Sequence, residues 1–417
     1  LTEDESLAAV QLLQGQLDYV HIVAGTSASL GGAVHIVPPM AVEAAYLARE
    51  AGTFKAQLSI PLFVTGRINQ PQEAEAIIAK GQADVCGMTR ALICDPQMPN
   101  KSDSGRAEDV RACIACNQAC IGHFHKGLPI SCIQHPETGR ELLYGQPKPS
   151  ARGKRILVVG GGPAGMKAAA VAAQRGHQVT LYEASAQLGG QIQLAQLLPR
   201  RSEFGGASTN LQREMQLAGV EVVRNTRVDR ALIERENPDH VIIATGAQPY
   251  WPNFERGGDL QVVDAWQVLR DEVQLGRSVV VADWRCDWIG PGIAERLVRA
   301  GHQVQLAVNG THCGENLPLY VRDQLAGELH KLAVPIIPYA RLYGCDDSTV
   351  YLQHTASGEP MLLENVDSLV LCQGHQSVDD LGQQLKGLVP FQRIGDCLAP
   401  RTVEEAIHEG LKVAWAL

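Results

Sequence analysis

The sequence contains no run of apolar residues that approaches the ~18 needed to span a bilayer. Its first ten residues, LTEDESLAAV, include neither a basic segment nor an apolar one, which argues against a secretory signal. Basic residues are scattered along a chain of net charge -9, so the basic stripe of a nucleic-acid-binding protein is missing. We therefore predict a protein with a small-molecule substrate, no membrane span and no nucleic-acid partner.

The composition is typical of a large α/β protein. The 417 residues, 45% hydrophobic and 19% charged with 41 glycines, are enough for two or three domains. Eleven cysteines are present, an odd number in a chain without a signal peptide. This count favours free thiols in a reducing compartment over a disulfide framework, and it predicts a cytoplasmic location.

Apolar strands and amphipathic helices alternate along most of the chain, a pattern typical of parallel βαβ units. This alternation of strands and helices stops in a cysteine-bearing segment that ends in the proline-containing linker GQPKPSARG. It resumes at Lys154 with KRILVVGGGPAG and starts again at Arg277 with RSVVVADW. The predicted regions are 1–100, the cysteine segment 101–150, a nucleotide-type domain over 151–275 with 370–417, and a second such domain over 276–369.

The segment CIACNQACIGHFHKGLPISC separates four cysteines by gaps of two, three and eleven residues; they are Cys113, Cys116, Cys120 and Cys132. Three closely spaced thiolates with a more distant fourth are typical of a [4Fe-4S] cluster. A structural zinc site would more often use two separate CxxC pairs, and only one is present. Zinc and purely structural thiols stay as alternatives, while the absence of CxxCH excludes c-type haem here.

The string VVGGGPAGMKAAAVAAQRGHQVTLYE predicts a strand, a glycine turn, a helix and a second strand that ends in an acid. Gly160 would permit the tight turn, Gly162 the approach of a pyrophosphate, and Gly165 the packing of helix on strand. The helix N-terminus would favour the phosphates, and Glu183, 23 residues after Gly160, could bind ribose hydroxyls. The alternative is a tight turn with a structural role only.

Two later strings, IIATG at 242–246 and RIGDC at 393–397, support nucleotide binding. This half resembles flavoproteins of the pyridine-nucleotide disulfide reductase type, in which the Asp of a GD pair contacts the ribityl–pyrophosphate part of FAD. The sequence leaves open whether FAD or only ADP is bound. The predicted contacts are Gly160, Gly162, Ala164, Gly165, Glu183, Gly190, Gln191, Thr245, Gly246, Gly395 and Asp396.

The second strand–turn–helix–strand pattern is SVVVADWRCDWIGPGIAERLVRAGHQVQLAV. Its helix and following strand have the same spacing as in the first pattern, but its turn differs. Nine residues separate Val281 from Gly290, against six between Val159 and Gly165. The altered turn carries Trp284, Arg285, Asp287 and Trp288, and Val308 stands where Glu183 would be expected. We predict that the fold is kept and the NAD(P) site is lost because bulky side chains fill it. The alternative is another ligand bound by the Trp and Arg side chains.

Taken in order, these motifs resemble the multidomain branch of the old yellow enzyme family, which includes 2,4-dienoyl-CoA reductase and trimethylamine dehydrogenase. The resemblance implies an α/β chain made of the C-terminal part of an FMN-binding TIM barrel, an iron–sulfur loop, and two Rossmann-like FAD/NAD(P)-type domains. In such barrels the loops after strands seven and eight hold the flavin phosphate. The matching residues are Gly66, Arg67, Gly87, Met88, Thr89 and Arg90, with ordinary loop turns as the alternative.

The first five barrel strands have no counterpart in the sequence. The resemblance therefore implies a parent protein ~250 residues longer, from typical barrel size. The acid/base pair of the family would lie in that missing part, which leaves the catalytic residues unknown and His35 as a weak candidate on the substrate side. The chain also starts with Leu1, not with an initiator methionine.

The resemblance is strongest to enzymes of N-methylproline breakdown, through CIACNQACIGHFHKG and ADWRCDWIG. It implies oxidative N-demethylation of a small N-methylated amino acid or amine, with electrons passing from FMN through the cluster to a separate acceptor protein. The segment AGTSASLGGAVHIVPPM lacks the Trp and Asp of a trimethylamine pocket. An NAD(P)H-dependent 2,4-dienoyl-CoA or enoate reductase is the alternative, and a non-catalytic electron-transfer protein is a third. A homo-oligomer is also considered.

Overall fold

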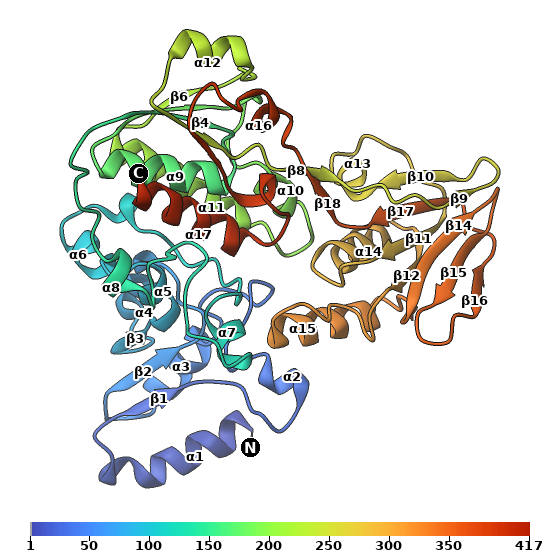
Figure 1. Cartoon of the computed structure of the whole chain (residues 1–417). Helices are drawn as coiled ribbons and strands as arrows, with labels where there is room; N and C mark the ends of the chain where they lie inside the picture. Colours follow the sequence, from blue (N-terminus) through green and yellow to red (C-terminus); the bar gives the residue numbers. More distant parts are fainter. Residues whose placement is uncertain (1) are drawn as a thin grey trace. The chain divides into compact units, whose positions relative to one another are not determined.

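The computed structural model describes residues 2–417 and divides into two compact units, one ending at Thr138 and the other beginning at Gly139 (Figure 1). Parallel strands alternate with helices in both units, which confirms the predicted α/β class. All eleven cysteines are free thiols. Within residues 2–417 no helix is both long and apolar enough to cross a membrane.

The first unit is built on a three-stranded parallel sheet of order β1-β2-β3. Its strands are β1 (Val20–Ile22), β2 (Leu62–Thr65) and β3 (Val85–Gly87). Leu62 and Val64 of the central strand are buried against Phe54 and Ile77 from the covering helices. The helices are α1 (Glu3–Leu13), α2 (Leu30–Ala33), α3 (Ala48–Lys55), α4 (Pro71–Ala79), α5 (Thr89–Cys94), α6 (Met98–Asp103) and α7 (Ile121–His125).

The second unit opens with a parallel sheet of order β19-β7-β4-β5-β6. Its strands are β4 (Arg155–Val159), β5 (Gln178–Tyr182), β6 (Glu221–Val223), β7 (His240–Ile243) and β19 (Phe391–Arg393). The helices are α8 (Glu141–Tyr144), α9 (Pro163–Gln174), α10 (Ile192–Ala195), α11 (Phe204–Ala218), α12 (Arg230–Glu236), α16 (Asp380–Gln384) and α17 (Val403–Ala416). The alanines of α9 are buried because α11 and α17 both pack on it, and small side chains allow that close approach.

A second parallel sheet, of order β10-β17-β11-β12-β13, follows in the same unit. Its strands are β10 (Gln261–Asp264), β11 (Ser278–Asp283), β12 (Gln303–Val308), β13 (Ile336–Ile337) and β17 (Ser368–Cys372), with helices α13 (Ala265–Leu269), α14 (Ile289–Arg299) and α15 (Leu319–Lys331). An antiparallel sheet of order β16-β15-β14 pairs with β9, and β8 pairs with β18. These are β8 (Ala247–Pro249), β9 (Glu255–Arg256), β14 (Ala340–Cys345), β15 (Val350–His354), β16 (Pro360–Leu363) and β18 (His375–Ser377).

Candidate functional site

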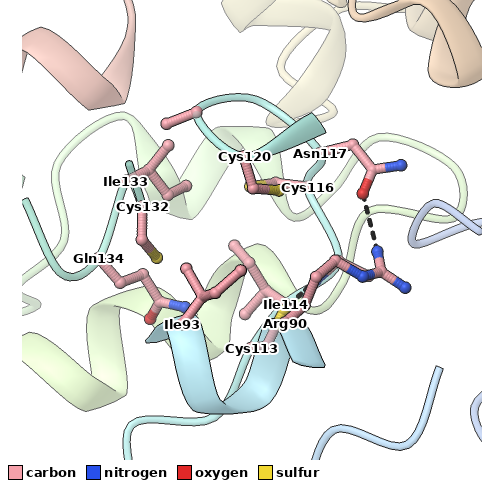
Figure 2. Close-up of a pocket in the computed structure, with 12 residues that line it drawn as sticks. Arg90, Ile93, Cys113, Ile114, Cys116, Asn117, Cys120, Cys132, Ile133 and Gln134 are labelled. Carbon is pink, nitrogen blue, oxygen red and sulfur yellow. Dashed lines mark hydrogen bonds between the residues drawn. The ribbon is translucent and has the colours of Figure 1, made fainter. Parts of the chain in front are cut away.

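The four predicted cysteine ligands line one cavity with an empty volume of about 340 Å³ (Figure 2). The rest of the wall is largely apolar and includes Ile93, Ile114 and Ile133. The loop can bring the thiols to one side because Ala115 and Asn117 adopt left-handed backbone conformations, with φ of 49° and 58°. The backbone N–H of Ala115 also donates to the sulfur of Cys113 at 3.4 Å.

Burial changes how readily these thiols ionise. It raises the pKa of Cys113 to about 11, and it also raises the pKa values of Cys116 and Cys120. The pKa of Cys132 is instead lowered to about 7, first by a hydrogen bond with the thiol of Cys94. Such an apolar site would hold several cysteines as thiolates only if a bound cation compensated their negative charge.

The donor set fits a cluster better than a single ion. Among residues 2–417, no three His, Cys, Asp or Glu side chains lie close enough together to hold one metal ion. Tetrahedral zinc would require such convergence, whereas in a [4Fe-4S] cluster each thiolate binds a different iron and the sulfurs stand farther apart. Four thiols around one largely apolar cavity are what the predicted cluster needs, and the [4Fe-4S] cluster stays a prediction with zinc as its alternative.

Arg90 lies on the wall of the cysteine cavity. One nitrogen of its guanidinium, Nη1, donates to Asn117 Oδ1 at 2.7 Å and to the Pro38 carbonyl at 2.8 Å (Figure 2). Asn117 in turn donates to the Val37 carbonyl at 2.8 Å. The family resemblance predicts Arg90 beside a flavin phosphate, and the structure adds a hydrogen bond from Arg90 to Asn117 of the cysteine loop.

The other predicted flavin-phosphate residues follow two neighbouring parallel strands. Gly66 and Arg67 come directly after β2, while Gly87 closes β3 and is followed by Met88 and Thr89. Arg67 is only 5% exposed and donates to the Val42 carbonyl. A Cβ at Gly87 would lie 2.1 Å from Thr65 Oγ1, so this position requires glycine. Their contact with a flavin remains a prediction.

His35, the weak catalytic candidate, packs against Tyr46. Their ring centroids are 5.5 Å apart, and the Tyr46 hydroxyl donates to the His35 carbonyl at 3.3 Å. The imidazole is partly buried. His35 Nδ1 is buried without a hydrogen-bond partner among the described residues, and a catalytic role for His35 stays a prediction.

The first glycine turn has the geometry that nucleotide binding needs. Gly160 has φ of 107°, and a Cβ there would lie 2.3 Å from the Ala244 carbonyl. A Cβ at Gly165 would lie 2.0 Å from the Gly160 carbonyl, whereas one at Gly162 would meet nothing within 4 Å. Packing therefore imposes glycine at the first and third positions, and the second faces open space at the N-terminus of α9.

A cleft with an empty volume of about 860 Å³ adjoins this turn. Glu183 lines it, and its carboxylate accepts from the N–H groups of Gly161 at 2.7 Å and Ser185 at 2.8 Å. Gly160 and Thr245 also contribute to the wall. Sequence analysis missed several polar lining residues on later segments, for which no local motif exists; they are Thr226, Arg227, Asp229, Asp380 and Gln384.

The remaining predicted contacts meet near the same turn. Gln191 donates to Asp396 Oδ2 at 2.8 Å, although the two residues are far apart in sequence. A Cβ at Gly190 would lie 3.1 Å from Gly162 Cα, and one at Gly395 would lie 2.8 Å from the Ala164 side chain. Gly246 has φ of 74°, which suits glycine.

In the second glycine turn, Asp283 stands at the position that Gly160 holds in the first. In the first sheet Arg155 pairs with Gln178. The equivalent pair in the second sheet is Ser278 with Gln303. Counted along the strands from these pairs, Ala282 corresponds to Val159 and Asp283 to Gly160. Counting from this register corrects the sequence estimate, which took Val281 as the equivalent of Val159. The turn is two residues longer than the first, not three.

The Asp283 carboxyl group occupies the start of α14. A Cβ at Gly290 would lie 2.5 Å from Asp283 Oδ2, so the carboxyl lies directly against the glycine that opens the helix. Oδ1 accepts from the N–H groups of Arg285 at 3.1 Å and Cys286 at 3.0 Å. Two backbone amides of the turn, those of Arg285 and Cys286, are thus already paired with a side chain of the chain itself.

The bulky residues that the sequence analysis held responsible make contacts of their own. Trp284 is 46% exposed, and Arg285 forms an ion pair with Asp287 at 3.0 Å. Trp288 stacks beneath the Arg201 guanidinium, 3.5 Å from its carbon to the ring centroid. Arg285 and Asp287 line a pocket together with Cys372 and Gly374 at the end of β17, so obstruction by the side chains of this turn stays a prediction. A strand-register comparison would have pointed to Asp283.

Asp283 is almost fully buried, with 2% of its surface exposed. Burial, followed by the nearby Asp287 carboxylate, raises the pKa of Asp283 well above its ordinary value. The raised pKa favours an uncharged carboxyl group, which costs less to bury than a carboxylate.

Comparisons with protein families and curated proteins match two parts of the chain. Residues 154–390 match the family described as pyridine nucleotide-disulphide oxidoreductase, and residues 28–109 match the NADH:flavin oxidoreductase / NADH oxidase family. The NADH oxidase of Thermoanaerobacter brockii is 35% identical over 100% of this chain and 64% of its own length. The N,N-dimethylglycine/sarcosine dehydrogenase of Chromohalobacter salexigens is 30% identical, with 99% and 66% covered.

A probable N-methylproline demethylase of Rhizobium meliloti is 30% identical over 96% of this chain and 63% of its own length. Among solved structures, a complex of 2-naphthoyl-CoA reductase superposes with a TM-score of 0.91 at 29% identity, covering 100% of this chain and 63% of that one. The chain thus spans about two thirds or less of the length of these relatives.

Proposed function

We propose, on the premise that this chain belongs to the multidomain old yellow enzyme family of flavin-dependent oxidoreductases, that it serves the oxidative N-demethylation of a small N-methylated amino acid or amine. N-methylproline is the substrate type that we favour. Electrons would leave the flavin through a [4Fe-4S] cluster to a separate acceptor protein. The relatives named for dimethylglycine, sarcosine and N-methylproline support this substrate class.

The observation that carries the proposal is the Asp283 carboxyl group at the start of α14. A reductase driven by NAD(P)H needs a dinucleotide turn whose amides are free to bind pyrophosphate. Here the amides of Arg285 and Cys286 already donate to Asp283. Electrons are therefore expected to come from the substrate, as in a dehydrogenase, and not from a nicotinamide.

The chain's own residues have distinct tasks in this scheme. FMN, when bound, accepts a hydride, and the cluster, when bound, carries single electrons. Arg67 and the loop from Gly87 to Arg90 would orient the flavin phosphate, while Cys113, Cys116, Cys120 and Cys132 would hold the cluster. The Gly160 turn, Glu183 and Asp396 would hold FAD or its ADP portion, and the apolar wall of Ile93, Ile114 and Ile133 excludes water from the thiolates.

The second candidate is an NAD(P)H-dependent 2,4-dienoyl-CoA or enoate reductase. The observation in its favour is similarity: the NADH oxidase of Thermoanaerobacter brockii and the 2-naphthoyl-CoA reductase structure match this chain as well as the amine dehydrogenases do. It would require a dinucleotide to bind in spite of Asp283.

Anaerobic mixing of the full-length enzyme with candidate substrates tests the substrate class. N-methylproline, dimethylglycine and sarcosine are mixed separately with the oxidised enzyme, and the flavin absorbance is followed. At least one of them is expected to bleach the flavin within the turnover time, and unmethylated proline is the matched control. No bleaching by any N-methylated compound, together with rapid bleaching by NADPH, would favour the second candidate.

A further inference from the structure

One segment of the chain, residues 188–204, extends from the first glycine turn to helix α14 of the second parallel sheet. Near its start, the N–H of Gly189 donates to the Gly161 carbonyl at 2.8 Å. Gln191 then donates to Asp396 Oδ2, also at 2.8 Å. The segment therefore begins among the residues that are predicted to hold the nucleotide.

The middle of this segment is buried against α14. Leu198 belongs to the same hydrophobic cluster as Ile293 and Leu297 of that helix. A Cβ at Gly292 would lie 2.9 Å from Leu198 Cδ2, so a larger residue at this position of α14 would displace the leucine. The segment is thus part of the core around α14, although its first residues lie at the other glycine turn.

Arg201 contacts two aromatic rings, one in its own segment and one beside α14. Its guanidinium carbon is 4.5 Å from the ring centroid of Phe204 and 3.5 Å from that of Trp288. Phe204 is buried and opens α11, while Trp288 immediately precedes α14. A guanidinium over an aromatic face is attracted by the electrons of the ring, most strongly for tryptophan. Arg201 therefore links the end of the segment to the start of α14.

Arg200 adds ion pairs to the same interface. Its Nη2 lies 2.6 Å from Glu328 Oε1 of α15, and its Nε lies 3.7 Å from Glu295 Oε1 of α14. Arg299 of α14 pairs with both carboxylates, so four charged side chains form one network. Arg200 has φ of 57°, a left-handed conformation that a non-glycine residue rarely adopts. The backbone bends in this way where two consecutive arginines contact the helices of the second sheet.

We propose that the region around α14 supports the nucleotide site at the first glycine turn, with Arg201 and Trp288 as positioning residues that fix segment 188–204. The inference rests on the proposed binding of FAD or ADP at that turn. Both side chains lie outside the lining of the cleft beside the turn, so they act through the segment and the bond of Gln191 with Asp396. Without the cation–π contact the segment opens more often, and the nucleotide dissociates faster.

The test uses the full-length holoenzyme and the rate at which its adenine nucleotide is lost. The protein is diluted, and the nucleotide that stays bound is released by denaturation at intervals and measured by chromatography as FAD or ADP. Trp288→Ala is expected to lose its nucleotide about tenfold faster than wild type, because the cation–π contact is removed. Arg201→Ala should have a similar effect, and the double variant no larger one, since both changes remove the same contact.

Two further variants distinguish this role from a general loss of structure. Trp284→Ala makes the same exchange four residues earlier, at a tryptophan that is 46% exposed, and it should retain its nucleotide as long as wild type does. Trp288→Phe keeps an aromatic face for Arg201 and is expected to restore most of the retention time.

The nucleotide content of the wild type is read first. If it is zero, the proposed nucleotide site fails; the measurement needs no substrate, so a failure of the demethylation proposal leaves it unchanged. If Trp288→Ala and Arg201→Ala retain nucleotide as long as wild type, the positioning role is contradicted although the site stands. Equally fast loss from Trp284→Ala, or no rescue by Trp288→Phe, would also overturn it. Should Trp288→Ala fail to fold, Arg201→Gln, a change at a partly exposed side chain, decides the question by the same measurement.

Discussion

Replacing Cys116 with alanine is expected to remove the cluster and to reduce steady-state turnover with an external acceptor protein to background. Cys116 lies in the wall of the cavity and is one of the four predicted cluster ligands. Reduction of the flavin by substrate should survive, because the hydride step does not pass through the cysteine loop. Iron content, the visible spectrum and single-turnover flavin bleaching measure the three effects separately.

The Cys86→Ala protein is the control for this variant, since it makes the same exchange at a cysteine outside the cavity lining. It should retain iron and turnover. If Cys116→Ala protein keeps a full cluster, or keeps turnover without one, then the loop cysteines do not carry the electrons outward.

Two substitutions of Asp283 are expected to distinguish the contribution of its hydrogen bonds to stability from the contribution of its charge. Asp283→Ala leaves the amides of Arg285 and Cys286 without their acceptor, and Cys286 is buried. An unpaired buried donor costs ~1–3 kcal/mol, so the alanine variant should be less stable than Asp283→Asn by about that amount. The asparagine keeps an oxygen at the same place and cannot ionise.

The pH dependence of the asparagine variant has a definite sign. The pKa of Asp283 is raised above its ordinary value of 3.8 in the folded chain. Its contribution to stability is therefore fully present below that value and is lost as pH rises toward the folded pKa. The free energy of unfolding of Asp283→Asn minus that of wild type should consequently increase from pH 4 upward. Urea unfolding of both proteins across this range measures it, and a difference that falls with pH would mean that Asp283 is paired with a cation.

Local sequence patterns predicted the parts of the structure that depend on short-range geometry. Apolar periodicity located β4, α9 and β5, and the spacing of the loop cysteines predicted that they would share one site. Gly160 and Gly165 were recognisable because the backbone contacts that require glycine come from the turn itself and from β7's continuation at Ala244.

Other features depend on contacts between distant segments, which spacing cannot reveal. The bond of Arg90 with Asn117 joins α5 to the cysteine loop, and the bond of Gln191 with Asp396 spans most of the second unit. Asp283 was overlooked because its role follows from strand register and not from the length of the turn. Tryptophans in that turn suggested obstruction by size, and the structure adds a small buried acid that lies against Gly290.

The fold of a dinucleotide domain and its ability to bind a dinucleotide are often inferred together, and the surroundings of Asp283 allow them to be considered separately. The parallel sheet around β11 and the helix α14 retain the architecture of a dinucleotide domain. The amides that would recognise the ligand are nevertheless paired within the chain. Architecture and binding are separate properties, and the proposed direction of electron flow rests on the second.

Anaerobic titration of the full-length holoenzyme with NADH and NADPH tests the direction of electron flow most directly. We predict that neither nucleotide bleaches the flavin or binds at the Gly290 turn, while an N-methylated substrate reduces the same preparation. Rapid bleaching by either nucleotide, at a rate sufficient for turnover, would contradict the account.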